Sequence, residues 1–214
     1  MELILIRHGQ TKANHERRLV GRSLDLPLTE LGVMQINHLG KHLQDTQVNI
    51  LRTSPTQRTL QTMEIIQRYV YVQNGPHVAK EIIERDYGSF EGLLRNELIS
   101  KRQTLGIDSN DPTNYFPDGI ENVETRYSVF KRVETLIQQD FNALPSNSTI
   151  MYITHGGLIY SLLTEKLGIP ETMVRPIIIR EGGYVRCSIN RYFYEINELW
   201  NNPIIDKGAY HAKS

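Results

Sequence analysis

The sequence predicts an α/β protein, a three-layer sandwich with a mostly parallel central sheet and helices on both of its faces. Two observations predict this fold class. Short, mostly apolar runs at Leu3–Ile6, Val48–Arg52 and Thr149–Thr154 are typical of strands buried on both faces. Longer segments between them carry apolar residues at spacings of three and four, the period of helices that pack on a sheet. Because parallel strands need such crossovers, the alternation favours a parallel sheet.

Local signals place the helix starts and strands of the first half of the chain. Thr29 is a suitable N-cap because its hydroxyl can accept from a free amide at a helix start. Ser54 followed by Pro55 signals another helix, since proline tolerates the first helical position. The turn signal at residues 74–76 predicts that a strand follows it. The expected elements after the first strand are a helix at 29–45, a strand at Val48–Arg52, a helix from 55 to about 69 and a strand at Val78–Ile83.

The second half contains an irregular stretch rich in turn residues at 103–119. Residues 93–120 are therefore a candidate lid or substrate loop. An apolar stripe from Val123 to Phe141 predicts a long helix. The remaining expected elements are a strand at Thr149–Thr154, a helix at 158–167, one or two strands within 185–196 and a loosely attached tail at 200–214.

Composition narrows the class of protein. The chain has 214 residues, and 24 Lys and Arg balance 24 Asp and Glu. A neutral balance argues against nucleic acid or a membrane surface as a partner, and the length fits a single domain over residues 1–214. The lone Cys187 offers neither an internal disulfide nor a thiolate cluster. The first apolar run stops at Arg7, too early for a signal peptide or a spanning helix, so we expect a cytoplasmic protein.

Charged side chains follow three of the expected strands. Arg7 and His8 follow the first, Arg58 lies just beyond the second, and His155 follows Thr149–Thr154. Ligands of open α/β sheets bind outside the carboxyl ends of the strands, where the loops converge. Two imidazoles and two guanidiniums would form an anion site there, because arginine presents a planar fork that matches phosphate oxygens.

Four blocks, in order along the chain, resemble the histidine phosphatase superfamily, which includes the phosphoglycerate mutases. The first block is Arg7–Asn14, which is followed by Gly21, Pro27–Thr29 and Gly32. The other three blocks are Ser54–Thr62, Glu84–Gly92 and Thr154–Gly157. The resemblance implies a phosphoglycerate mutase-like fold and phosphoryl transfer without a metal or another cofactor.

The resemblance also implies roles for individual residues. His8 would be the nucleophile, Arg7, Arg58 and His155 would surround the phosphoryl oxygens, and Glu84 would act as acid and base. The implied substrate-binding residues are Thr11, Asn14, Gly21 and Gly156.

Each role has a structural alternative. Without the motif, His8 would read as a buried histidine at a strand end, Arg58 as a solvated surface residue and His155 as a cap. Asp86 and Glu91 lie close enough in sequence to replace Glu84 as the proton donor. Thr11 and Asn14 could equally be helix-cap residues.

The sequence departs from the mutase pattern after Gly92. Mutases carry adjacent arginines there for the substrate carboxylate, whereas Arg95, Lys101 and Arg102 include no such pair. His155 is followed by two glycines, as in the phosphatases. We therefore predict a histidine acid-type phosphatase, a metal-independent phosphomonoester hydrolase that acts through a phosphohistidine on a small phosphorylated metabolite. The alternatives are a 2,3-bisphosphoglycerate-dependent phosphoglycerate mutase and a non-catalytic sensor of phosphorylated ligands.

Two other patterns give weaker signals. His38 and His42 have the spacing of a metal-binding pair on a helix, but no acidic partner completes a known motif. Residues 191–194 mix arginine with aromatic side chains, as nucleic-acid platforms do, but alternation on an edge strand explains them equally well. We expect neither a metal site nor nucleic-acid binding.

Overall fold

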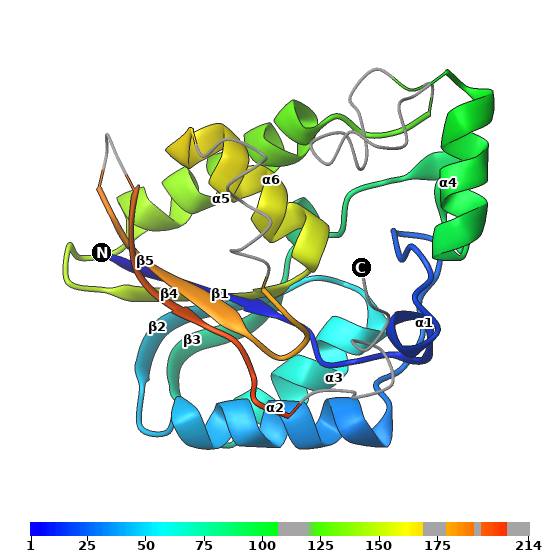
Figure 1. The fold of residues 1–214 in the computed structure, drawn as a ribbon. Coiled ribbons are helices and arrows are strands. Elements are labelled where there is room, and N and C mark those ends of the chain that lie inside the picture. The colour runs from blue at the N-terminus through cyan, green and yellow to red at the C-terminus, as the bar shows by residue number, and fades with distance from the viewer. Residues whose placement is uncertain (107–119, 121, 169–178, 191–193, 205–214) are drawn as a thin grey trace.

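The computed structural model describes residues 1–106, 120, 122–168, 179–190 and 194–204 (Figure 1). Its elements, in chain order, are β1 (Glu2–Arg7), α1 (Lys12–His15), α2 (Glu30–His42), β2 (Gln47–Thr53), α3 (Gln57–Ile66), β3 (Tyr71–Val78), the 3₁₀ turns η1 (Lys80–Ile82) and η2 (Gly88–Phe90), α4 (Arg95–Thr104), α5 (Arg126–Ala143), β4 (Thr149–Thr154), α6 (Gly156–Leu167), β5 (Tyr184–Ile189) and β6 (Tyr194–Trp200).

The strands form one six-stranded sheet in the order β3-β2-β4-β1-β5-β6. β1 to β4 run parallel, while β5 pairs antiparallel with both β1 and β6. The predicted fold class, an α/β sandwich with a mostly parallel sheet, is confirmed. The antiparallel pairs are confined to the β5 side of the sheet.

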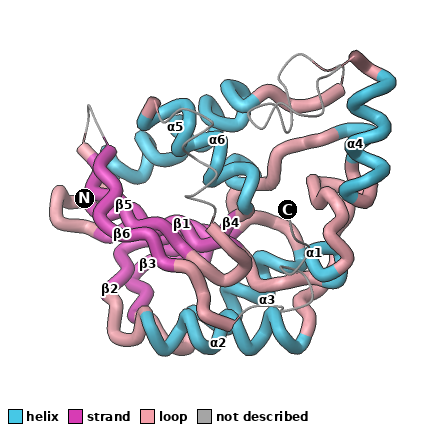
Figure 2. The backbone as a smooth tube through the Cα atoms, viewed as in Figure 1, coloured by secondary structure: helices cyan, strands magenta, loops and turns pink. Residues whose placement is uncertain are grey.

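Helices cover both faces of the sheet. α2 and α3 lie on one face, and α5 and α6 lie on the other (Figures 1 and 2). Leu3 and Leu5 of β1 pack with the α5 and α6 side chains, while Ile4 and Ile6 pack with those of α2 and α3. Because both faces are covered, β1 needs an apolar side chain at every inner position, which explains its continuous apolar run.

Most of the expected elements are present. Thr29 is the N-cap of α2, where its hydroxyl accepts from the Gly32 amide at 3.0 Å. β2 and β4 match the predicted strands, and the long helix is α5, which starts after Thr125 rather than at Val123. Within the expected region 185–196, residues 185–189 lie in β5 and residues 194–196 lie in β6, and residues 191–193 lie outside the described residues.

Two expectations around α3 and β3 are wrong. Ser54 does not cap α3, which begins after Thr56, because the Ser54 hydroxyl binds His155 instead. The turn signal at residues 74–76 lies inside β3, and η1 occupies residues 80–82 of the strand that was expected at Val78–Ile83. β3 is an edge strand, where a proline costs no ladder hydrogen bond on its open side.

The candidate lid and the tail are only partly described. Residues 95–104 of the 93–120 segment form α4, and residues 107–119 lie outside the described residues. Of the tail, residues 205–214 lie outside the description, and the part before them is not loose. The Asn202 side chain is buried and donates to the Gln35 carbonyl at 2.7 Å, and Trp200 stacks on His42.

β1, β2 and β4 end at the same edge of the sheet, and α1 and α4 lie beyond that edge (Figure 1). The loops that follow Arg7, Thr53 and Thr154 therefore converge there. None of the described helices has the length and apolar character needed to cross a bilayer.

Candidate active site

His8 lies at the carboxyl end of β1 and is almost completely buried. Its Nδ1 lies 2.7 Å from the Gly9 carbonyl oxygen. Since a carbonyl only accepts, Nδ1 carries the proton in the neutral ring and Nε2 keeps its lone pair. Burial lowers the pKa of His8 well below its usual value, and the nearby charges of Arg58 and Arg7 lower it further. The site therefore holds a neutral imidazole with one unprotonated nitrogen.

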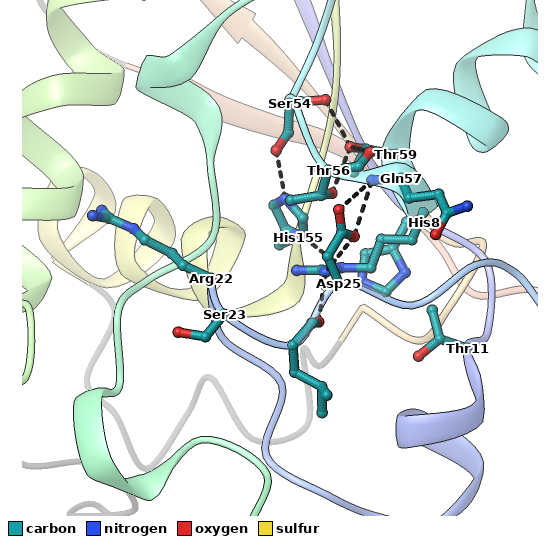
Figure 3. A network of polar contacts seen from close by, with 12 residues as sticks. His8, Thr11, Arg22, Ser23, Asp25, Ser54, Thr56, Gln57, Thr59 and His155 are labelled. Carbon is teal, nitrogen blue, oxygen red and sulfur yellow. Dashed lines mark hydrogen bonds and ion pairs between the residues drawn. The ribbon is translucent and has the colours of Figure 1, made fainter.

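His155 lies beside His8, and the two ring centroids are 5.3 Å apart. Its Nε2 is 2.7 Å from the Ser54 hydroxyl, and its Nδ1 accepts from Arg58 Nε at 3.2 Å (Figure 3). Burial lowers the pKa of His155, and the Arg58 charge lowers it further. Both ring nitrogens are thus engaged, so a phosphate oxygen would have to displace Ser54 before it could bind this ring.

Arg58 is completely buried, so its alternative interpretation as a solvated surface residue is wrong. Besides His155, its guanidinium contacts the carbonyls of Leu24 and Gly21 and one oxygen of Asp25. Burial lowers the pKa of Arg58, but the group starts so high that it remains charged. Its four contacts leave at least one of five N–H donors for a ligand.

The Arg7 guanidinium is held by two residues that precede β5. It donates to the Ile179 carbonyl at 2.8 Å and pairs with Glu181 at 2.5 Å. Its Nε is buried and has no hydrogen-bond partner among the described residues. A buried N–H without a partner is costly, so this donor is available to an anion at the site.

Glu84 reaches the site from the segment after η1. Its carboxylate is buried and accepts from the amides of Arg85 at 2.8 Å and Gly157 at 3.1 Å. Burial raises the pKa of Glu84, although the two amides and the charges of Arg58 and Arg7 act against that rise. A carboxyl group with a raised pKa is suited to proton transfer near neutral pH.

The two rival carboxylates have other partners. Asp86 accepts from the Gly88 amide at 2.8 Å and so closes its own turn. Glu91 accepts from the amides of Arg22, Ser23 and Tyr87. Geometry therefore favours Glu84 over both as the acid of this site.

The four expected substrate-binding residues have mixed positions. Thr11 caps α1 and forms a capping box with Asn14, whose Oδ1 accepts from the Thr11 amide at 2.9 Å. Gly21 directs its carbonyl to Arg58 and packs against Glu91. Gly156 begins α6, and a Cβ built on it would lie 3.1 Å from Arg7 Cζ. The positive end of α6 thus lies beside Arg7, where it favours an anion.

Three further residues shape the site without having been assigned a role from sequence. Ser54 binds His155, and Asp25 accepts from both Arg58 and the Gln57 amide at the start of α3 (Figure 3). The buried Tyr87 hydroxyl faces Gly157, since a Cβ there would lie 2.2 Å from it. Ser54 and Tyr87 lie inside the motif blocks, and this position was the sequence signal that could have identified them as site residues. No local pattern in the sequence marks Asp25.

His38 and His42 are not part of a metal-binding cluster with acidic side chains in the described part of the chain. Both rings stack on Trp200, and His42 Nε2 lies 3.2 Å from the Tyr184 hydroxyl. In the described part of the chain, no cluster of three or more His, Cys, Asp or Glu side chains has an arrangement that could hold a metal ion.

Comparison with known proteins gives consistent results. The model of the histidine phosphatase superfamily (branch 1) matches residues 3–202. The uncharacterized phosphatase PhoE of Bacillus subtilis is 33% identical over 165 residues, which cover 77% of this chain and 76% of that protein. The probable phosphoglycerate mutase GpmB of Proteus mirabilis is 30% identical over 203 residues, covering 94% and 87%. The solved structure of Bacillus stearothermophilus YhfR superimposes with a TM-score of 0.72 at 25% identity, covering 92% and 95%.

Proposed function

This chain belongs to the histidine phosphatase superfamily, branch 1, and on that premise we propose that it is a metal-independent phosphomonoesterase acting through a phosphohistidine at His8. The observation that carries the proposal is the contact between His8 Nδ1 and the Gly9 carbonyl, because it leaves Nε2 free to attack phosphorus. The proposed substrate is a small phosphorylated metabolite, and the phosphatase name of the Bacillus subtilis relative supports the hydrolase activity.

In the first step, His8 Nε2 forms a bond to phosphorus while the ester P–O bond breaks. Negative charge on the phosphoryl oxygens is stabilised by Arg7, Arg58 and the amino terminus of α6. Protonated Glu84 gives its proton to the departing alkoxide oxygen, so the alcohol leaves neutral.

In the second step, water attacks the phosphohistidine. Glu84, now a carboxylate, takes a proton from that water as the new P–O bond forms and the P–N bond breaks. His8 returns to its neutral state and Glu84 to its acid state. Burial supports both changes, because it disfavours the imidazolium form of His8 and the carboxylate form of Glu84.

His155 acts in this scheme by holding Arg58. Its Nδ1 accepts from Arg58 Nε, and Ser54 fixes the ring from the other side. The guanidinium therefore keeps one orientation during both steps, which lowers the reorganisation that charge transfer requires.

The mutase alternative has less support from the site. Arg102 is buried, and Lys101 donates to the Ser89 carbonyl and hydroxyl, so neither replaces the arginine pair of the mutases. The relative named as a probable mutase keeps this alternative open to test. Priming with 2,3-bisphosphoglycerate should not produce exchange of phosphate between positions of phosphoglycerate.

The decisive experiment is turnover of an aryl phosphate in EDTA together with acid-labile labelling of the protein by ³²P-substrate. The wild type should turn over and label, and His8→Ala should do neither. His77→Ala, which removes an exposed histidine on β3, is the matched control and should do both. Full activity of His8→Ala would refute the mechanism, and binding without labelling would favour the sensor alternative.

A further inference from the structure

A second concave site adjoins the phosphoryl site on the side of Arg7. It has a volume of about 250 Å³, and its lining residues include Asn14 and Arg7, whose charge also acts on His8. Three more arginines, Arg17, Arg18 and Arg95, line this pocket, and Glu181 is the only carboxylate among the lining residues that the structure describes. Positive charge thus continues outward from the place where phosphate would bind.

The outer arginines are brought together by a short backbone ladder. Residues 17–19 follow α1, and residues 92–95 precede and begin α4. The Leu19 amide donates to the Leu93 carbonyl at 3.0 Å, and the Gly92 amide donates to the Leu19 carbonyl at 2.9 Å. Arg18 also pairs with Leu94 as an isolated bridge and donates to the Gly92 carbonyl. Because Arg18 is paired with Leu94, the segment that holds Arg17 and Arg18 lies beside the segment that holds Arg95, and all three arginines line the pocket.

Below the arginines, the wall of this pocket is apolar. Leu98 is buried in a small apolar cluster with Phe90, and Leu19 and Leu93 pack against that cluster. All three leucines also line the pocket. A fixed apolar wall with charged groups at its rim is suited to a short carbon chain that ends in an anion.

Two of the described carboxylates near the pocket are already paired. Glu181 binds Arg7, and Glu16 binds Arg18 at 2.6 Å. The Arg95 side chain is exposed and makes no hydrogen bond or ion pair with any residue the structure describes. Asn14 uses its Oδ1 to bind Thr11, so its amide nitrogen is the group it can offer to a ligand.

Arg17 occupies a strained backbone position. Its φ is 57°, in the left-handed region that costs a residue other than glycine on the order of 1 kcal/mol. A glycine or asparagine would relieve this strain at the end of α1. An arginine there is explained if its side chain has a task in the pocket it lines.

We propose that this pocket is a second anion subsite and that the substrate is a phosphomonoester carrying another anionic group on a short carbon chain. The proposal rests on the phosphatase function proposed above. Arg7 and His8 take the scissile phosphate, and Arg17, Arg18 and Arg95 take the other anion, a carboxylate or a second phosphate. Arginine recognises both through the same charge-assisted, bidentate contacts.

The test uses three matched esters that differ only at the third carbon: 3-hydroxypropyl phosphate, 2-carboxyethyl phosphate and propane-1,3-diyl bisphosphate. For the wild type, kcat/KM for at least one two-anion ester should exceed that for the hydroxypropyl ester by about tenfold, the size of one charge-assisted contact. The carboxylate and bisphosphate arms identify which anion the subsite prefers. Equal kcat/KM for all three esters would overturn the proposal.

The Arg17→Met/Arg95→Met double variant should remove this preference through an increase in KM for the two-anion ester. Arg68→Met removes an exposed arginine after α3 and should keep the preference, which controls for the loss of charge elsewhere. A double variant that retains the wild-type preference, or that loses activity equally on all three esters, would contradict the assignment.

Failure of the subsite and failure of the catalytic proposal give different results. Turnover of 3-hydroxypropyl phosphate by the wild type tests the phosphatase function alone. Calorimetric binding to His8→Ala tests the pocket without turnover, and propane-1,3-diyl bisphosphate or 2-carboxyethyl phosphate should bind about tenfold more tightly than the hydroxypropyl ester. Equal binding of all three would overturn the subsite even if the enzyme is an active phosphatase.

Discussion

Gly157→Ala should disable the proton-transfer side of the site. A Cβ at this position would lie 2.2 Å from the Tyr87 hydroxyl and 2.8 Å from Glu84 Oε1. Real Cβ contacts essentially never fall below 3.0 Å, so the hydroxyl must retreat by about 0.8 Å and the carboxylate by a smaller amount. Both side chains are buried, and their neighbours resist the shift.

The magnitude follows from that displacement. Overpacking a buried site costs about 1–3 kcal/mol of unfolding free energy, so the variant should still fold. A misplacement approaching 1 Å in a catalytic group costs roughly 100-fold in rate. We expect a loss of this order in kcat/KM for an alkyl phosphate, because this parameter reports transfer to His8, in which the leaving oxygen needs the proton from Glu84.

The assay compares an alkyl phosphate with p-nitrophenyl phosphate, whose leaving group departs without a proton. Gly157→Ala should lower kcat/KM for the alkyl ester far more than for the aryl ester, whereas the attack of water on the phosphohistidine is common to both. Tyr87→Phe in the same chain removes the atom in the closest clash and should restore part of the lost rate. Equal losses on both esters, or a wild-type rate on the alkyl ester, would refute the reasoning.

Three further predictions concern the buried histidines and their partners. The pH profile of kcat/KM should be bell-shaped, since activity requires neutral His8, whose pKa is lowered, and protonated Glu84, whose pKa is raised. Glu84→Gln should abolish the alkaline limb of this profile. An alkaline limb that persists in the variant would exclude Glu84 as the proton donor. The free energy of unfolding should fall as the pH drops below about 6.5, because His8 and His155 bind protons in the unfolded chain but stay neutral when buried in the folded protein. Urea titrations at pH 7.5 and 5.5 measure this change. A free energy of unfolding that is equal or higher at pH 5.5 would contradict the prediction. Ser54→Ala should cost about 1–3 kcal/mol of unfolding free energy, because it leaves a buried donor of His155 without its partner, whereas Ser89→Ala, at an exposed position, should cost far less.

The elements that could be predicted are those whose signal is local. β1 and β4 are continuous apolar runs because helices cover both faces of the sheet, and α2 begins where Thr29 can cap it. Ser54 was misread because its hydroxyl had two possible partners, and the one it binds is 101 residues away in sequence. β3 was misplaced because a turn signal carries no information about an edge strand that tolerates it.

By itself, the sequence determined the α/β architecture and predicted an anion site, because imidazole and guanidinium side chains follow three parallel strands whose carboxyl ends lie at one edge of the sheet. Only the tertiary structure decided which nitrogen of His8 is free, that Glu84 and not Asp86 is buried beside Gly157, and that Arg17 and Arg95 line one pocket. The physical reason is that periodicity and capping act over a few residues, whereas most of the hydrogen bonds, ion pairs and desolvation that fix these groups depend on partners far along the chain.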